Sequence, residues 1–196
     1  MENFQQKIEK FRVIVKENFR RKDFTYHEWM VEYHLDIVER IAFELCEFYP
    51  EANKEIVQTL VWFHDFGKPI DEENEREITL VKGPMVLLDL GFPEEFVNTI
   101  VDYWKLFEQK NEIDLRTTPI EVQIVSSADG ASHFTGVFYP SYFGDGNDFA
   151  TTQKNLAEKI EKDWNRKIVL SEAQKAFEQR YIRAKELLGV FPDKFI

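Results

Sequence analysis

The chain has 196 residues, a length typical of one domain. With 43% hydrophobic and 15% aromatic residues, including 18 phenylalanines, it can build a substantial apolar core, which excludes intrinsic disorder. The formal net charge of −11 disfavours duplex nucleic acid and anionic membranes as partners, because both would be repelled. We therefore expect a globular protein that binds neither.

Cysteine usage and the N-terminal residues indicate the cytoplasm. The single cysteine, Cys46, allows neither an internal disulfide nor a thiolate zinc site, which fits a reducing compartment. No stretch approaches the roughly 18 apolar residues of a membrane-spanning helix. Residues 1–7 lack the basic and hydrophobic segments of a signal peptide. The expected location is cytoplasmic.

Apolar residues recur at helical spacing along most of the chain, which predicts a succession of helices. In chain order, these helices cover about residues 4–15, 31–45, 53–64, 76–90, 96–107, 119–129, 152–164 and 171–188. Thr118 is the expected N-cap of the sixth helix, with Pro119 at its first position. Ser171 and Gln174 are expected to form a capping box on the last helix, and the acidic run at 71–75 to be a solvated loop.

Strand signals are nearly absent, since the one β-branched run, at residues 168–170, is too short to found a sheet. Residues 136–149 contain three glycines, one proline and five aromatics, which favours an ordered loop or lid. This segment either lines a pocket, where it could stack a base, or is an ordinary loop held against the core. We therefore predict an all-α fold, a single compact domain of about eight helices over residues 1–196.

Three of the four histidines, His34, His64 and His133, lie on apolar helical faces or just beyond one. Any one of them alone is most simply a core histidine that hydrogen-bonds to a carbonyl. His64 and Asp65, however, are adjacent at the end of the apolar run at 60–63, where an unpaired carboxylate would be costly. A divalent cation is one of the few partners that would stabilise both side chains.

Asp129 repeats this pattern at the end of the apolar stretch 124–128, which suggests that both acids contribute to one site. Two nitrogen and two oxygen donors would then come from His34, His64, Asp65 and Asp129. Such a set suits Mn, Fe, Co, Ni, Zn or Mg and leaves positions for water and substrate. In a purely structural helical protein, the same side chains would have to satisfy one another without a metal, at a higher energetic cost.

These residues resemble the HD-domain metal-dependent phosphohydrolases, an all-α superfamily named for its adjacent His-Asp pair. The similar segments are residues 34–42, where the first histidine begins a helix, residues 60–68, which end in His-Asp-Phe-Gly-Lys, and residues 127–130, which contain the closing aspartate. Together they span about residues 26–134. In the predicted domain this span is the motif core, and the C-terminal helices over 151–188 pack on it.

The resemblance implies that His34, His64, Asp65 and Asp129 bind one divalent metal. Relatives with two or more metals carry further histidines after the pair, in segments that correspond here to residues 75–79 and 100–104. Neither segment contains a histidine, so we expect a mononuclear centre.

The resemblance also indicates residues for catalysis and substrate binding. Lys68 and Asp65 are the predicted catalytic residues, because the Gly67-Lys68 pair matches the motif and its ammonium could reach a phosphate at the metal. The alternative for Lys68 is a solvated lysine at a helix end. His133 and His27 are further candidates for substrate contacts or for support of the ligands, against a structural or surface role for each.

The expected function is metal-dependent hydrolysis of a phosphate ester or anhydride of a small, nucleotide-like substrate. The metal would polarise a phosphoryl oxygen and lower the pKa of a bound water. The alternative is a non-catalytic module of the same fold that senses metal or nucleotide or binds a partner. The sequence leaves open the substrate, the metal, the choice among phosphomonoesterase, phosphodiesterase and pyrophosphohydrolase, and the oligomeric state, a homodimer included.

Overall fold

The computed structural model describes residues 3–144, 148–190 and 194, and within these ranges the protein is all-α, as predicted. The α-helices are α1 (Phe4–Phe19), α2 (Asp36–Cys46), α3 (Lys54–Phe63), α4 (Glu75–Asp89), α5 (Glu94–Glu108), α6 (Ile120–Ser132), α7 (Phe138–Ser141), α8 (Phe149–Lys162) and α9 (Ser171–Leu187). No helix in the described ranges is long and apolar enough to cross a membrane.

Two π-helical turns extend longer helices at places that matter for the site. The turn η1 (Val31–Leu35) runs directly into α2, and the turn η4 (Asp163–Lys167) continues α8. Two short 3₁₀ turns, η2 (Leu115–Thr117) and η3 (Tyr142–Gly144), precede α6 and follow α7. Because a π turn closes its backbone hydrogen bond one residue later than an α turn, it widens the helix locally and changes the direction of its side chains.

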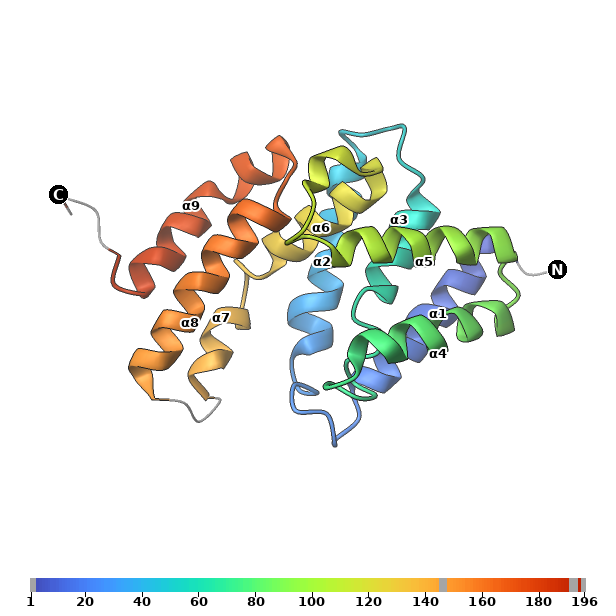
Figure 1. Cartoon of the computed structure of the whole chain (residues 1–196), viewed down its shortest axis with the longest axis horizontal. Coiled ribbons are helices and arrows are strands. Elements are labelled where there is room, and N and C mark those ends of the chain that lie inside the picture. Colours follow the sequence, from blue (N-terminus) through green and yellow to red (C-terminus); the bar gives the residue numbers. More distant parts are fainter. Residues whose placement is uncertain (1–2, 145–147, 191–193, 195–196) are drawn as a thin grey trace.

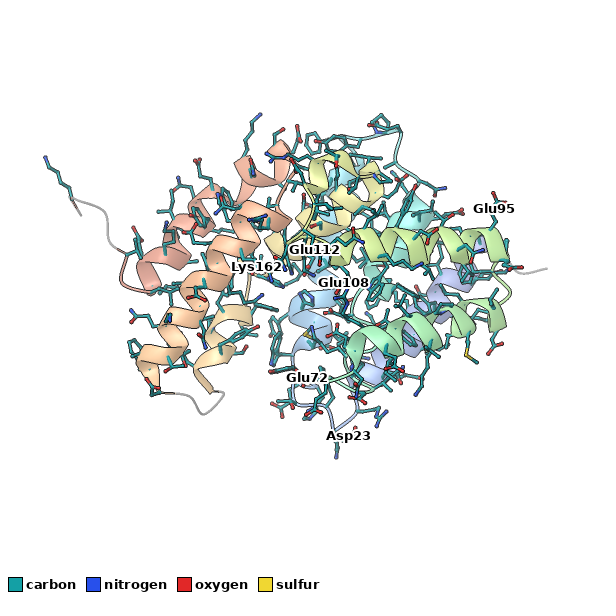
Figure 2. The ribbon with its side chains drawn as sticks, in the orientation of Figure 1. Asp23, Glu72, Glu95, Glu108, Glu112 and Lys162 are labelled. Atoms are coloured by element: carbon teal, nitrogen blue, oxygen red, sulfur yellow. The ribbon has the colours of Figure 1, made fainter. Side chains whose placement is uncertain are left out.

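The helices fall into two groups that meet at α6 (Figure 1). Helices α1 to α5 pack on one side of it, with α2 and α3 in direct contact, and η4 and α9 pack on the other. Glu108 at the end of α5 and Lys162 at the end of α8 lie near this boundary, whereas Asp23, Glu72 and Glu95 lie at the edge of the molecule (Figure 2). Helix α6 is therefore a shared wall, and all of its residues from Ile124 to Ser132 are buried.

Small residues in α6 allow η4 to approach very closely. A Cβ atom at Gly130 would lie 2.8 Å from the Cβ of Lys167 and 3.2 Å from the carbonyl oxygen of Asp163. The Ser126 hydroxyl donates to the Lys167 carbonyl at 3.0 Å, and the Ser127 hydroxyl accepts from the backbone N–H groups of the two residues at 169 and 170. This contact brings the side chains of η4 next to Asp129.

Two predicted helix caps are wrong. Pro119 holds the N-cap position of α6, and the Thr118 hydroxyl instead donates to the Leu115 carbonyl, because the preceding residues form the 3₁₀ turn η2. At α9 the Ser171 hydroxyl donates to Glu172 and the Gln174 side chain donates to the Ile168 carbonyl, so no capping box forms.

The predicted loop over residues 136–149 contains more helix than expected. The structure places α7 and η3 in it, which raises the number of α-helices in the described residues to nine, and residues 145–147 lie outside the described ranges. The helices in this segment are short because glycine and proline limit helix length. Phe138 and Tyr139 are buried, whereas Phe143 and Phe149 are exposed.

Candidate metal centre

Three of the four predicted ligands, His34, Asp65 and Asp129, line one cavity of about 290 Å³, and the fourth, His64, lies with its Nε2 3.5 Å from Asp65 Oδ2. His34 lies on η1, His64 follows the last residue of α3, and Asp129 lies in the last turn of α6, with Asp65 next to His64 in the chain. His34, His64 and Asp129 are buried, and the Asp65 side chain is 13% exposed. The apolar faces of these elements pack against one another in the core. The polar residues at the ends of the apolar faces are therefore brought close together.

The donor atoms form two close sets that share His34, and the distances to Asp65 match those expected around one ion. His34 Nε2 and His64 Nε2 each lie 3.5 Å from Asp65 Oδ2, and His34 Nε2 lies 3.8 Å from Asp129 Oδ1. Donor atoms about 2.0–2.2 Å from a metal, at tetrahedral or octahedral angles, lie roughly 3–3.6 Å apart. The sets His34–His64–Asp65 and His34–Asp129–His133 each bring their donor atoms within 4.8 Å of one another.

Hydrogen bonds fix the tautomer of both predicted histidine ligands. His64 Nδ1 lies 2.6 Å from the Val61 carbonyl, which can only accept, so Nδ1 carries the proton. His34 Nδ1 lies 2.9 Å from the Ser132 hydroxyl, whose own proton goes to the Asp129 carbonyl. In both rings the lone pair is therefore on Nε2, the nitrogen that faces the carboxylates, as in metal-binding histidines.

One unsatisfied buried atom supports a metal at this position. His64 Nε2 is buried and has no hydrogen-bond partner among the described residues. Buried polar atoms without a partner are rare in folded proteins, and a lone pair that faces the Asp65 carboxylate at 3.5 Å needs a cation. The residues present thus fit a divalent metal, which would satisfy this nitrogen.

The ionisation states also suit metal ligands. Burial lowers the pKa of His34 to about 4, so its ring is neutral near pH 7. Burial opposes ionisation of Asp65 and Asp129, but Lys68 and Lys167, respectively, hold the pKa of each carboxyl well below its usual value. Neutral imidazoles and ionised carboxylates are the forms that bind metals.

Five basic residues line the same cavity, which is notable in a chain of net charge −11: Lys68, Arg76, Lys110, Lys159 and Lys167. The Lys68 ammonium lies 3.2 Å from Asp65 Oδ2. The Lys167 ammonium lies 2.6 Å from Asp129 Oδ2. These groups lie beside the donor set and outnumber by one the four carboxylates of the lining, so they offer cationic partners for an anionic ligand.

Glu75 belongs to this cavity, although its acidic run was expected to be a solvated loop. It begins α4 and lines the cavity near Asp65, and burial together with the Asp65 charge raises its pKa to about 7. The expectation for this residue is wrong because Gly67 lets α4 pack against the turn after His64. A Cβ there would lie 2.1 Å from the Glu75 carbonyl oxygen.

The other two histidines have different surroundings. His133 Nε2 lies 3.2 Å from Asp129 Oδ1, and its Nδ1 lies 2.8 Å from Asp163 Oδ2, so His133 is part of the centre. His27 is half-buried with Nδ1 2.8 Å from the Phe24 carbonyl, and it is not among the residues that line the cavity.

Sequence reasoning missed a group of charges in η4 and the end of α8. Asp163 is completely buried and accepts hydrogen bonds from Tyr139 at 3.0 Å and from His133, while the Lys159 ammonium lies 3.2 Å away. Lys167 joins the group through Asp129. The only sequence signal is the spacing of four residues from Lys159 to Asp163 to Lys167, which is typical of a solvated helix face with ion pairs.

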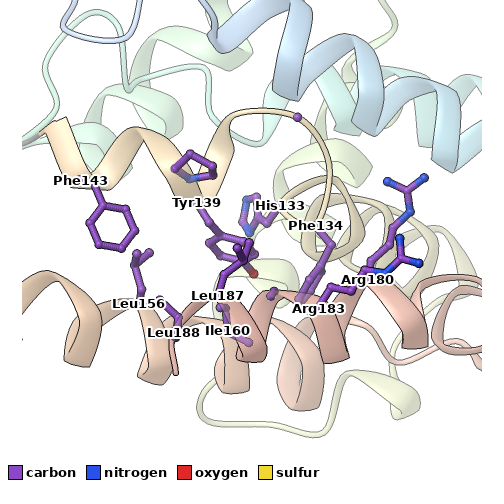
Figure 3. Close-up of a pocket in the computed structure, with 13 residues that line it drawn as sticks. His133, Phe134, Tyr139, Phe143, Leu156, Ile160, Arg180, Arg183, Leu187 and Leu188 are labelled. Carbon is purple, nitrogen blue, oxygen red and sulfur yellow. The ribbon is translucent and has the colours of Figure 1, made fainter. Parts of the chain in front are cut away.

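The aromatic segment after α6 forms a wall with two faces. Phe138 stacks on His133, with ring centroids 3.7 Å apart, and lines the metal cavity together with Tyr142. Tyr139 and Phe143 face a second, largely apolar cavity of about 470 Å³ that extends to α8 and α9 (Figure 3). His133 borders both cavities.

Comparisons with known proteins support the fold. No protein-family model and no curated protein matches the chain. The crystal structure of Bacillus subtilis YpgQ in complex with ADP is similar, with a TM-score of 0.68, 16% sequence identity and coverage of 97% of each chain. At this identity the likeness concerns the fold alone, and it supports an HD-like fold for this chain.

Proposed function

We propose that the protein is a metal-dependent hydrolase of phosphate esters or anhydrides of small, nucleotide-like molecules. The observation that carries this proposal is the cavity itself, in which the candidate donors His34, Asp65 and Asp129 lie beside five basic side chains, with His64 Nε2 3.5 Å from Asp65. The donors suit a divalent cation and the basic side chains suit the phosphate of a substrate.

His34, His64, Asp65 and Asp129 would hold the ion. A divalent metal bound there supplies Lewis-acid activation of a phosphoryl oxygen and of water. The residues around it fix the ligands, since Ser132 and the Val61 carbonyl hold the two imidazoles in the tautomer that leaves Nε2 free to bind.

Lys68 is suited to stabilise the phosphoryl group. Although burial opposes it, the neighbouring Asp65 and Glu75 raise the pKa of Lys68, so the side chain stays cationic at neutral pH. Its ammonium touches the ligand Asp65 and lines the cavity, which places it within reach of an anion at the metal. Charge that builds up on phosphoryl oxygens during hydrolysis would be stabilised there.

The cavity wall favours a nucleotide-like substrate. Arg76 and Lys110 flank Glu108 at 3.4 and 3.0 Å and lie beside the cavity, where they could bind further phosphate groups. Phe138 and Tyr142 offer aromatic surface against which a base could pack. The similarity in fold to a protein solved with ADP is consistent with this substrate class.

A screen for metal-dependent hydrolysis tests the proposal. Protein stripped by a chelator would be reloaded with Mn, Fe, Co, Ni, Zn or Mg and offered nucleoside mono-, di- and triphosphates, dinucleotides, sugar phosphates and pyrophosphate, with products separated by chromatography. We expect hydrolysis that needs the metal and is lost in Asp65→Asn. Lys162→Met is the matched control, since this lysine lies on α8 but not in the cavity lining. Nucleotide binding without hydrolysis under every metal would instead identify the non-catalytic alternative.

A further inference from the structure

We infer that His133 is a fifth ligand of the metal, that it binds through Nε2, and that Asp163 is the positioning residue that holds it there. The resulting set of three imidazoles and two carboxylates selects a transition-metal ion over Mg²⁺. This inference rests on the metal centre of the proposed function.

The hydrogen bond to Asp163 determines which nitrogen of His133 carries the proton. Asp163 accepts from the Tyr139 hydroxyl at 3.0 Å and lies 3.2 Å from the Lys159 ammonium, so it is an ionised carboxylate that can only accept. His133 Nδ1, 2.8 Å away, must therefore donate. In the neutral form, which is the form that binds a metal, the lone pair is then on Nε2, which faces Asp129 Oδ1 at 3.2 Å.

The three histidines of the centre then share one arrangement. Each Nδ1 faces an acceptor, a hydroxyl for His34, a carbonyl for His64 and a carboxylate for His133, and each Nε2 faces a carboxylate of the donor set. The ring of His133 is also held in its plane, because it stacks on Phe138 and on His34, with centroids 3.7 and 5.2 Å apart. A rigid ring with a fixed tautomer is the usual state of a metal-binding histidine.

Each carboxylate beside His133 also has an ammonium partner. Asp129 is already paired with the Lys167 ammonium at 2.6 Å, and Asp163 with Lys159 at 3.2 Å and Lys167 at 3.7 Å. Two lone-pair atoms that face each other, His133 Nε2 and Asp129 Oδ1, need a shared cation, which the metal provides.

A third imidazole changes which metals the site prefers. Mg²⁺ favours an octahedron of oxygen ligands and retains several waters, whereas imidazole nitrogens suit Mn, Fe, Co, Ni and Zn. With two oxygen ligands against three nitrogen ligands, the site is better suited to the latter ions. We expect bound Co²⁺ or Mn²⁺ to resist competition by millimolar Mg²⁺.

Proton NMR of the Co²⁺-loaded wild-type protein, with ¹⁵N-labelled histidine, counts the ligands directly. Each metal-bound ring with a protonated Nδ1 gives one N–H resonance shifted far from its normal position by the paramagnetic ion. We expect three such resonances, which the Asp163→Asn variant shifts or broadens. Two resonances in the wild-type protein would overturn the inference.

Metal affinity provides an independent measurement without substrate. His133→Gln should weaken Co²⁺ binding and change its visible absorption spectrum, and Asp163→Asn should weaken binding by about 10–100-fold, the usual cost of losing a residue that orients a ligand. Lys162→Met is the control and should bind as the wild type does. Circular dichroism checks that each variant is folded, and the NMR count in the wild-type protein decides the matter if one is not.

The two proposals fail in different ways. If the wild-type protein binds Co²⁺ and His133→Gln binds it equally well with the same spectrum, the fifth ligand is refuted and the metal centre stands. If the wild-type protein binds no divalent metal, the proposed function is refuted together with the inference. Mg²⁺ binding as tight as Co²⁺ binding would refute the selectivity.

Discussion

The two groups of helices contribute to the same centre in different ways. The part of the chain from α1 to α6 provides the four predicted donors, and three of them, His64, Asp65 and Asp129, stand at the ends of apolar runs that are visible in the sequence. The segment from α7 to η4 provides Asp163, Lys159 and Lys167, which bind or balance those donors. Ligands can therefore be found from local patterns, while the groups that orient and charge them depend on packing between distant segments.

The largest effect is expected from a change that removes the ion pair between Asp129 and Lys167, which joins the two groups of helices. Asp129→Ala should abolish metal binding and hydrolysis, because one donor is lost. It should also reduce the free energy of unfolding by about 3–5 kcal/mol, because the buried Lys167 ammonium would lose its nearest carboxylate and keep only Asp163 at 3.7 Å. Metal analysis, activity and urea unfolding measure the three effects.

A double variant separates the two roles of Asp129. Asp129→Ala combined with Lys167→Met should recover most of the lost stability without recovering metal binding. If the single variant were as stable as the wild type, the ion pair between the two groups would not contribute to folding. If it retained metal and activity, Asp129 would not be the closing ligand.

A large but purely catalytic effect is expected within the first group. Lys68→Ala should lower kcat/KM by about 10²–10³-fold, the usual cost of losing one electrostatic contact to the transition state, and leave the metal content unchanged. The reason is that a protonated lysine has no lone pair for a metal but can stabilise phosphoryl charge. Kinetics and metal analysis on the same preparation give the answer. An unchanged kcat/KM would return Lys68 to the role of a solvated lysine.

A smaller effect should follow from pushing the two groups apart. Gly130→Ala would place a methyl group 2.8 Å from the Lys167 Cβ, so we expect a loss of about 1–3 kcal/mol in the free energy of unfolding, typical of overpacking. Metal affinity should fall as well, because η4 carries Asp163. Gly144→Ala is the matched control, since no atom lies within 4 Å of a Cβ there. Equal stability of the two variants would show that the close approach of η4 to α6 at Gly130 does not contribute to stability.

The smallest net effect concerns the pH dependence of stability, to which His34 and Glu75 contribute in opposite directions. The pKa of His34 is lowered to about 4 in the folded protein, so the unfolded chain binds more protons between about pH 4 and 6.5, and this histidine makes stability rise with pH there. The pKa of Glu75 is raised to about 7, so the folded protein binds more protons between about pH 4.5 and 7, and this group makes stability fall with pH. In the metal-free protein the two slopes should largely cancel.

Single substitutions should reveal each slope. Stability of metal-free Glu75→Gln should rise with pH between about pH 4.5 and 6.5, and that of metal-free His34→Gln should fall over the same range, as judged by urea unfolding at several pH values. If stability changed with pH in the same direction in both variants, the opposite pKa shifts of His34 and Glu75 would be contradicted.

The difference between the two groups also explains how far the sequence could be interpreted. Helical periodicity predicts the all-α fold, and the apolar runs before His64 and Asp129 predict buried acids and imidazoles, which the structure brings within 3.5–3.8 Å of each other. Their role as metal ligands stays a prediction. The predicted caps of α6 and α9 are wrong, because the Thr118 and Gln174 side chains donate their hydrogen bonds to nearby backbone carbonyls instead.

The residues that sequence reasoning missed owe their burial to close approaches elsewhere in the chain. Asp163 and Lys167 resemble a solvated helix face until Gly130 allows η4 to lie against α6. Glu75 resembles part of an acidic loop until Gly67 allows α4 to pack against the turn that follows His64. A single sequence gives no direct sign of which glycine will serve as such a contact, because glycine also occurs in ordinary turns.

The two π-helical turns have a consequence for insertions and deletions. A π turn is equivalent to one extra residue in an α-helix, and one residue corresponds to about 100° of rotation around the helix axis. His34 lies in η1, and Asp163 and Lys167 lie in η4. Deleting one residue from either turn would leave a regular helix of nearly the same length but rotate one side of it relative to the other. An alignment of this chain with a homologue that lacks either turn must therefore place a one-residue gap there, or it will pair the wrong side chains at the centre.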